Sequence, residues 1–195
     1  MRVFVAVPLD RGTDPCAAVL ERLHTSSWRP VPPGLRHLTL RFLGEISGAQ
    51  ADLVCEGIRA HCRGWPAMRA ELRGLGAFPH WRDPAVLWAG VVGPGRDELA
   101  RLAACVLEAT VSVGEPERRR SFVPHLTLAR RRSAAAPARA AAELERLPAP
   151  WRTAVWGELR LDTVVVYRSE LLAGGPRYTP LLSLGLAETA GEFVP

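Results

Sequence analysis

The sequence predicts an α+β fold built mainly from antiparallel strands. Strand-like and helix-like segments are interspersed along the chain, and several strand-like segments are joined by short turns only. Short turns favour antiparallel pairing over a doubly wound parallel sheet. With 195 residues, 48% of them hydrophobic, the chain can bury a core without disulfides. We expect a single domain over residues 1–187, followed by a flexible C-terminal tail at 188–195.

The first half of the chain shows alternating strand-like and helix-like patterns. Ser47 is a suitable N-cap for the second helix, and Pro66 stands beyond its end as a stop signal. Apolar alternation predicts strands, and three- or four-residue apolar spacing predicts helices. The resulting elements are strands at 2–9, 37–43, 67–75 and 85–92, helices at 14–24, 49–62 and 97–111, and a Pro/Gly-rich link at 29–34.

The second half repeats this arrangement loosely. A charged loop at 115–120 precedes a strand at 125–130, and an Ala-rich helix follows at about 138–147. Three further strands, at 151–156, 158–167 and 178–184, complete the domain. Residues 131–137 have the composition of a surface connector.

Every basic side chain is arginine, because the sequence contains no lysine. A phosphate-binding Walker A loop, Schiff-base or pyridoxal chemistry, and ATP-dependent nucleic-acid ligation all need a lysine, so these classes are excluded. Arginine binds phosphate well, because its planar guanidinium donates hydrogen bonds in pairs and stays charged. The net charge of +5 is therefore compatible with an RNA partner without proving one.

The remaining composition indicates a soluble cytoplasmic protein. No apolar segment approaches the ~18 residues of a membrane span, and the N-terminus lacks the pattern of a signal peptide. The four cysteines are irregularly spaced with no C-x-x-C pair, so we interpret them as small core residues. A metal site near Cys55, His61 and Cys62 is conceivable, but ordinary helix positions explain these residues more simply.

The most informative feature is an internal near-repeat. His37-Leu38-Thr39-Leu40 recurs as an identical segment at 125–128, each time in a strand pattern. Since strand side chains alternate, each histidine shares one face with its threonine while the leucines point to the other face. If the two strands are neighbours, two imidazoles and two hydroxyls converge on one groove.

These four side chains suit the opening of a cyclic phosphate. One group must accept a proton from water while another gives a proton to the departing ribose oxygen, and two histidines with ordinary pKa values near 6.5 can divide these tasks. The hydroxyls of Thr39 and Thr127 can donate to phosphoryl oxygens where charge develops. Neither a cofactor nor a metal is required, and no third ligand stands near His37 or His125.

The paired H-x-T segments resemble the signature of the 2H phosphoesterases. Their flanks resemble one branch, the LigT-like bacterial and archaeal RNA 2′,3′-cyclic phosphodiesterases, also described as 2′-5′ RNA ligases. The resemblance extends over most of the chain in the expected order. The matching stretches are residues 2–7, 35–45, 76–79, 86–91, 122–130 and 178–181.

This resemblance implies a bilobal fold, with two pseudo-symmetric lobes of antiparallel sheet and outer helices around a central cleft. It implies hydrolysis of RNA 2′,3′-cyclic phosphate ends to 2′-phosphates, acting on RNA or small cyclic nucleotides as a monomer. His37 would be the proton donor, His125 the proton acceptor, and Thr39 and Thr127 phosphate ligands. Phe42 would stack on the terminal base. Arg130 would contact phosphate or sugar.

Strict alternation, however, places Phe42 and Arg130 on the leucine side of their strands. They reach the cleft only if each strand ends or bulges just after its motif. Val123 stands where many relatives carry a basic or polar residue, which leaves substrate contacts there open.

Other conspicuous side chains have simpler interpretations. His24, His61 and His80 are expected to be structural or solvated, and the arginine runs at 118–120 and 130–132 are expected to be solvated loops except for Arg130. Most tryptophans are expected in the core, with Trp28 a candidate for the cleft edge. The expected core or lobe-packing tryptophans are Trp65, Trp81, Trp88, Trp151 and Trp156.

Two other functions remain open. The first is ATP-independent 2′-5′ joining of RNA ends, which is the reverse reaction with a ribose 5′-hydroxyl in place of water. The second is an RNA- or nucleotide-binding module without turnover, which the intact histidines and threonines disfavour.

Overall fold

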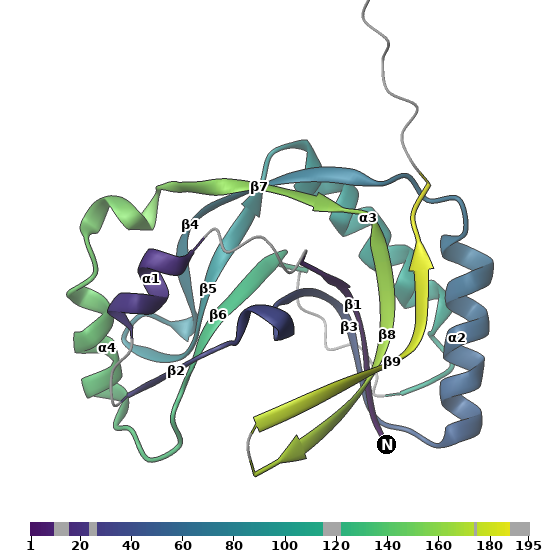
Figure 1. Cartoon of the computed structure of the whole chain (residues 1–195), viewed down its shortest axis with the longest axis horizontal. Helices are drawn as coiled ribbons and strands as arrows, with labels where there is room; N and C mark the ends of the chain where they lie inside the picture. The colour runs from purple at the N-terminus through teal and green to yellow at the C-terminus, as the bar shows by residue number, and fades with distance from the viewer. Residues whose placement is uncertain (10–15, 24–26, 115–121, 174, 188–195) are drawn as a thin grey trace, which may run out of the picture.

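A single curled sheet forms the centre of the molecule, and the helices lie around its outside and ends (Figure 1). The computed structural model describes residues 1–9, 16–23, 27–114, 122–173 and 175–187. The strands are β1 (Arg2–Pro8), β2 (Trp28–Pro30), β3 (His37–Glu45), β4 (Met68–His80), β5 (Asp83–Val92), β6 (His125–Arg131), β7 (Val155–Leu161), β8 (Thr163–Leu172) and β9 (Gly175–Gly185). The helices are α1 (Ala17–Arg22), α2 (Gly48–Cys62), α3 (Pro94–Ala109) and α4 (Pro137–Glu145), with 3₁₀ turns η1 (Pro33–Leu35) and η2 (Ala149–Arg152).

The nine-stranded sheet has the order β7-β4-β5-β6-β3-β1-β8-β9, and β2 pairs with β6 off this path. All of these strand pairs are antiparallel. The order is symmetric about its middle, because β3 and β6 each have three further strands on the outer side. A single bridge, Leu38 to Leu126, joins the two halves. The two copies of the repeated motif therefore meet where the halves of the sheet meet.

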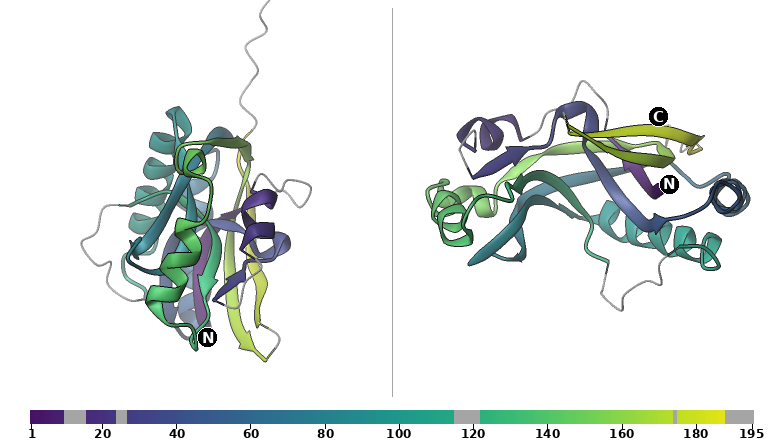
Figure 2. Two further views of the ribbon diagram at one scale, coloured as in Figure 1. Left: turned by 90° about the vertical axis from the view of Figure 1, so that its left-hand side faces the viewer. Right: turned by 90° about the horizontal axis from the view of Figure 1, so that it is seen from below.

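Local sequence explains how the main helices begin and where they pack. Ser47 accepts a hydrogen bond from the backbone N–H of Gln50 while the Gln50 side chain accepts one from the Ser47 backbone, which is a complete capping box at α2. Helices α2 and α3 contact each other, and α3 also packs against β3, β4 and β5. Figure 2 shows these two helices on one side of the sheet, leaving the concave side for other elements.

The expected α+β class with antiparallel strands is confirmed, and so is the Ser47 cap. Two expected strands are wrong in their limits: the segment around Trp151 forms a 3₁₀ turn, and residues 158–167 are divided between β7 and β8 at Asp162. Strand β2 was not expected, because it lies at the edge of a proline-rich segment. The expected helix at 14–24 is described as α1, and the remainder of that range lies largely outside the described residues.

The charged loop at 115–120 and the expected tail at 188–195 also lie outside the described residues. Among the residues that the structure describes, no helix is both long and apolar enough to cross a membrane.

Candidate active site

The bridge between β3 and β6 brings the two H-x-T segments onto one patch of the sheet. With Leu38 opposite Leu126, antiparallel pairing places His37 across from Thr127, and Thr39 across from His125. The two histidines are close enough for the charge of His125 to lower the pKa of His37. Both leucines are fully buried, while the four polar side chains are only partly buried. The register thus points two imidazoles and two hydroxyls to the same side.

Both imidazoles are held by the same local hydrogen bond. Nδ1 of His37 lies 2.8 Å from the carbonyl oxygen of Leu35, and Nδ1 of His125 lies 2.7 Å from that of Val123. A carbonyl can only accept, so Nδ1 carries the hydrogen in each ring and donates it. The neutral tautomer therefore leaves Nε2 as an acceptor, which becomes a donor when the ring is protonated. Each half of the protein presents one Nε2 that can either take or give a proton.

Burial makes both rings weaker bases than free histidine. It lowers the pKa of His37 from 6.5 to about 4; the hydrogen bond to Leu35 opposes this shift, and the positive charges of Arg130 and His125 add to it. The pKa of His125 is also lowered, again mainly by burial and partly by Arg130. A positively charged neighbour destabilises an imidazolium, whereas a bound phosphate would stabilise it. A histidine in this site can therefore donate a proton only when a bound anion stabilises its protonated form.

Two matching β-bulges turn Phe42 and Arg130 toward the histidine side. In the pairing of β1 with β3, Thr39 and Arg41 face consecutive residues of β1, so Leu40 is the extra residue. In the pairing of β5 with β6, Thr127 and Ala129 likewise face consecutive residues, so Leu128 is extra. A bulge of this kind reverses the alternation beyond it. Phe42 and Arg130, each five residues after a motif histidine, are accordingly exposed.

The first bulge is fixed by the arginine that follows its extra leucine. Arg41 is buried, and its Nη1 donates to the carbonyl of Leu107 at 2.9 Å and to the hydroxyl of Thr110 at 2.6 Å. Its Nη2 donates to the carbonyl of Val113 at 3.2 Å. These acceptors lie at and just beyond the C-terminal end of α3, where a cation is favoured by unpaired carbonyls and by the helix dipole. Arg41 thus faces the core, and Phe42 faces away from it.

A cavity of about 520 Å³ opens beside this patch. Its lining includes His37, Thr39, Thr127, Phe42 and Arg130. His125 is not among the lining residues, and its position beside the cavity is inferred from the strand register. Six arginines line the cavity, and no Asp or Glu is among the described lining residues. With six arginines and no described carboxylate in its lining, the cleft is strongly positive. The complete lining is Arg2, Phe4, Arg29, Pro30, Val31, Pro32, Leu35, Arg36, His37, Thr39, Phe42, Thr127, Arg130, Arg131, Arg132, Ser133, Ser169, Leu171, Pro176 and Tyr178.

Aromatic side chains surround the His37 ring. Phe4 lies 4.9 Å from it between centroids and 5.8 Å from Phe42, with which it is stacked. Tyr178 meets His37 edge-on at 5.5 Å, and Arg2 lies over the Phe42 ring at 5.0 Å. Phe4 and Tyr178 were not expected at the site. Phe4 lies in the matching stretch at 2–7 and Tyr178 in that at 178–181, so the family resemblance could have indicated both as site residues.

His125 has a different aromatic wall. Phe78 meets it edge-on at 5.0 Å and Trp88 lies at 5.9 Å. Gly76 makes this arrangement possible, because a Cβ added there would stand 2.1 Å from the Trp88 ring. Trp88 was expected only as a packing residue, yet it borders a motif histidine.

Trp28 and the arginine runs differ in part from what the sequence predicted. Trp28 was expected at the cleft edge, which is wrong: its side chain is fully buried, and its Nε1 donates to the carbonyl of Ala140 in α4. Arg131 and Arg132 line the cavity, although the run was expected to be solvated apart from Arg130. The run at 118–120 lies outside the described residues. Across the described ranges, no three His, Cys, Asp or Glu side chains are grouped so as to hold a metal ion.

Fold and site together define a class of protein: an antiparallel α+β molecule whose two halves each contribute one H-x-T strand to a basic cleft. Residues 9–170 match the family model described as the 2′-5′ RNA ligase superfamily. The chain belongs to this superfamily.

Named relatives agree with this placement. The chain is 34% identical over 150 residues to an RNA 2′,3′-cyclic phosphodiesterase of Aquifex aeolicus, covering 76% of this chain and 77% of the relative. It is 34% identical over 201 residues to the protein of the same name from Thermus thermophilus, covering 98% and 93%.

Solved structures show the same fold. A crystal structure of TT0787 from Thermus thermophilus has a TM-score of 0.74 at 31% identity, covering 95% of this chain and 98% of that one. Escherichia coli LigT complexed with 3′-AMP has a TM-score of 0.72 at 26% identity, with 95% and 97% covered.

Proposed function

We propose that this protein hydrolyses RNA 2′,3′-cyclic phosphate ends to 2′-phosphates, using two histidines and no metal. The main support is the placement of two imidazoles, one from each half of the sheet, each held through Nδ1. Both Nε2 atoms are therefore available to exchange protons with one substrate. The names of the relatives support the same reaction.

In the proposed step, Nε2 of neutral His125 accepts a proton from water, and the water oxygen bonds to phosphorus. The bond from phosphorus to the ribose O3′ breaks, and Nε2 of protonated His37 gives its proton to O3′. The product carries a 2′-phosphate and a free 3′-hydroxyl, and solvent restores the two protonation states. In-line displacement of this kind needs an acid and a base on opposite sides of phosphorus. The donor and acceptor roles follow the family resemblance.

The negative charge of the bound substrate would allow His37 to carry that proton. With its pKa at about 4 in the free protein, His37 is neutral at pH 7. The anionic cyclic phosphate brings a negative charge beside the ring and offsets the effect of Arg130, so the pKa rises when substrate binds. Thr39 and Thr127 donate to the phosphoryl oxygens, as preorganised donors do where negative charge increases.

In this proposal Phe42 binds the base of the terminal nucleotide, and Arg130 binds its phosphate or sugar. Phe42 offers a half-exposed ring, 49% accessible, on which the terminal base can stack. Arg130 faces the same cavity and interacts electrostatically with both histidines. The bulges in β3 and β6 explain why both side chains can serve the site although alternation alone would turn them away.

Ligation of RNA ends through a 2′-5′ linkage is a second candidate, favoured by the name of the superfamily. It uses the same groups in reverse, with a ribose 5′-hydroxyl in place of water. Water is far more concentrated than RNA ends, so hydrolysis should dominate in dilute solution.

The test is incubation of a short RNA ending in a 2′,3′-cyclic phosphate in the presence of EDTA, with the product read by ³¹P NMR. We expect a 2′-phosphate from the unmodified protein and no turnover from His125→Ala, which should still bind nucleotide. A 3′-phosphate product or turnover that needs added metal would contradict the mechanism. Unchanged turnover by His125→Ala would refute the assignment of that residue, and nucleotide binding without turnover by the unmodified protein would indicate a binding module.

A further inference from the structure

The positive charge of the cleft is concentrated beyond the catalytic patch, where β2 lies against β6. In this pairing Arg29 stands directly opposite Arg130. Directly opposed side chains in an antiparallel pair have Cβ atoms roughly 4.5–5.5 Å apart, and like charges in this relation destabilise the pair. Both arginines are exposed, and both line the cavity.

Neighbouring arginines have partners that these two lack. Arg131 forms an ion pair with Asp83 at 2.7 Å, and Nε of Arg132 donates to the carbonyl of Trp28 at 3.2 Å. Within the described ranges, neither the Arg29 nor the Arg130 side chain has a hydrogen bond or an ion pair. Two opposed guanidinium groups without a carboxylate suit an anion that both can bind.

The two sides of the cleft differ in chemistry as well as in position. Phe42 and Arg130 occupy equivalent places in the two halves, yet one is aromatic and the other is cationic. Leu171 and Pro176, from the β8–β9 hairpin, add apolar surface to the lining, whereas β2 and the end of β6 add arginine. Figure 1 shows this hairpin reaching past the sheet at the opposite side of the concave face from β2.

A terminal nucleotide has three substituents to place: the cyclic phosphate, the base and the RNA chain that continues from its 5′ oxygen. If the cyclic phosphate lies at the histidines and the base on Phe42, the arginine side is the part of the cleft that remains for the chain continuing from the 5′ oxygen. We infer that Arg29 and Arg130 together bind the phosphodiester on the 5′ side of the terminal nucleotide, with Arg132 and Ser133 beside it. This inference rests on the proposed function, and it names oligonucleotide ends, not cyclic mononucleotides, as the preferred substrate class.

The experiment compares three cyclic phosphates with one base: the nucleoside 2′,3′-cyclic phosphate, the same compound with a 5′-phosphate, and a dinucleotide with the same end. For the unmodified protein, kcat/KM should be roughly tenfold higher or more with a 5′-phosphate, as expected for a charge-assisted contact. Arg29→Ala should bring this ratio close to one, and Arg29→Lys should restore part of it. The slope of log kcat/KM against log salt concentration should fall by about 0.7 for the dinucleotide with Arg29→Ala, the value for one single-strand phosphate contact.

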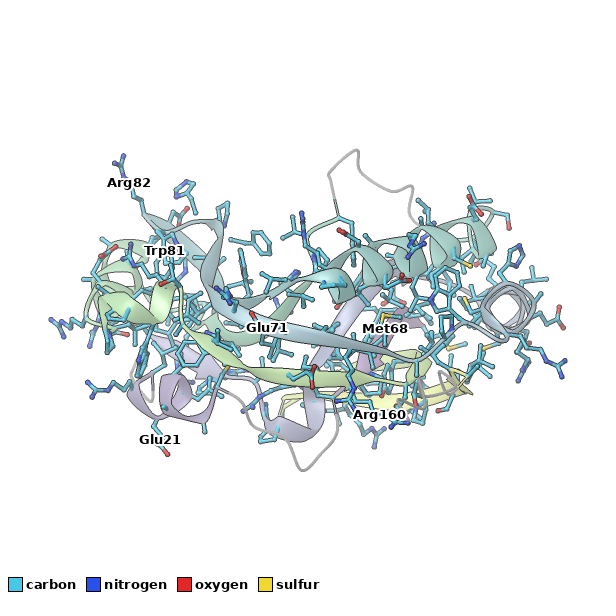
Figure 3. The ribbon with its side chains drawn as sticks, turned by 90° about the horizontal axis from the view of Figure 1, so that it is seen from above. Glu21, Met68, Glu71, Trp81, Arg82 and Arg160 are labelled. Atoms are coloured by element: carbon cyan, nitrogen blue, oxygen red, sulfur yellow. The ribbon has the colours of Figure 1, made fainter. Side chains whose placement is uncertain are left out.

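Arg82→Ala is the matched control. Arg82 is an exposed arginine at the β4–β5 turn and projects away from the body of the protein (Figure 3), and it is not among the described residues that line the cleft. Its removal also takes away one positive charge, but the ratio and the salt slope should both stay as in the unmodified protein. A fall of the ratio in Arg82→Ala equal to that in Arg29→Ala would mean that only net charge matters, and it would overturn the inference.

A binding measurement separates this inference from the proposed function. Titration calorimetry with a nucleoside 2′-phosphate, with and without a 5′-phosphate, needs no turnover. Tighter binding of the doubly phosphorylated ligand that Arg29→Ala abolishes supports the site even if no hydrolysis is found. Equal affinities for the two ligands in the unmodified protein would refute the site even if cyclic phosphates are hydrolysed.

Discussion

Lowering the pH should destabilise the folded protein through His37 in particular. The native ring has a pKa of about 4, against 6.5 for an unperturbed histidine. The unfolded chain therefore binds a proton at His37 at a higher pH than the native protein does, and stability decreases as the pH falls below 6.5. Each unit of difference corresponds to about 1.36 kcal/mol, so the loss attributable to this residue reaches about 3 kcal/mol at pH 4. Above pH 7 the contribution is fully retained.

The assay is urea denaturation between pH 7.5 and pH 4, on the unmodified protein and on His37→Gln. Other groups titrate in both proteins, so the difference between the two pH profiles isolates His37. We expect the free energy of unfolding of the unmodified protein to fall by about 3 kcal/mol more than that of the variant. His61→Gln, which replaces an exposed helix residue, should follow the unmodified protein. Parallel curves for the unmodified protein and His37→Gln would show that protonation of His37 does not destabilise the fold.

Three further substitutions test the supports of the site. Gly76→Ala should lower kcat roughly 10- to 100-fold, because the added Cβ displaces the indole ring behind His125, while Gly185→Ala, which meets nothing within 4 Å, should leave steady-state kinetics unchanged. Arg41→Ala should lower the free energy of unfolding by about 3 kcal/mol in urea titrations, because buried charged hydrogen bonds are lost; a loss under about 1 kcal/mol would contradict the anchoring role. Phe42→Ala should raise KM roughly tenfold through lost base stacking, with Leu53→Ala, another exposed apolar residue, as the unaffected control.

Much of the site could be predicted because it lies in local sequence. The alternation around His37 and His125 indicates strands, and an identical segment in each half indicates equivalent positions. These inferences require only the period of a strand and the chemistry of imidazole and hydroxyl groups. The antiparallel class and the capped helix at Ser47 follow from similarly local patterns.

The rest depends on pairing between distant segments. The bulges at Leu40 and Leu128 exist because neighbouring strands match one residue against two, and no local pattern showed where that mismatch falls. Strand β2 was missed because proline-rich composition predicts a loop, whereas pairing with β6 makes it a strand. Arg29 owes its place to that pairing, and Phe4 and Tyr178 reach His37 from strands at opposite ends of the chain.

A crystal structure with vanadate and a nucleoside bound in the cleft would show whether the two histidines act on one phosphorus centre, because vanadate adopts the five-coordinate geometry of a phosphorus centre under attack. We expect Nε2 of His37 and Nε2 of His125 on opposite sides of one vanadium, each within about 3.2 Å of one of its oxygens. A vanadium contacted by only one of the two rings, or held by other side chains, would contradict the two-histidine mechanism.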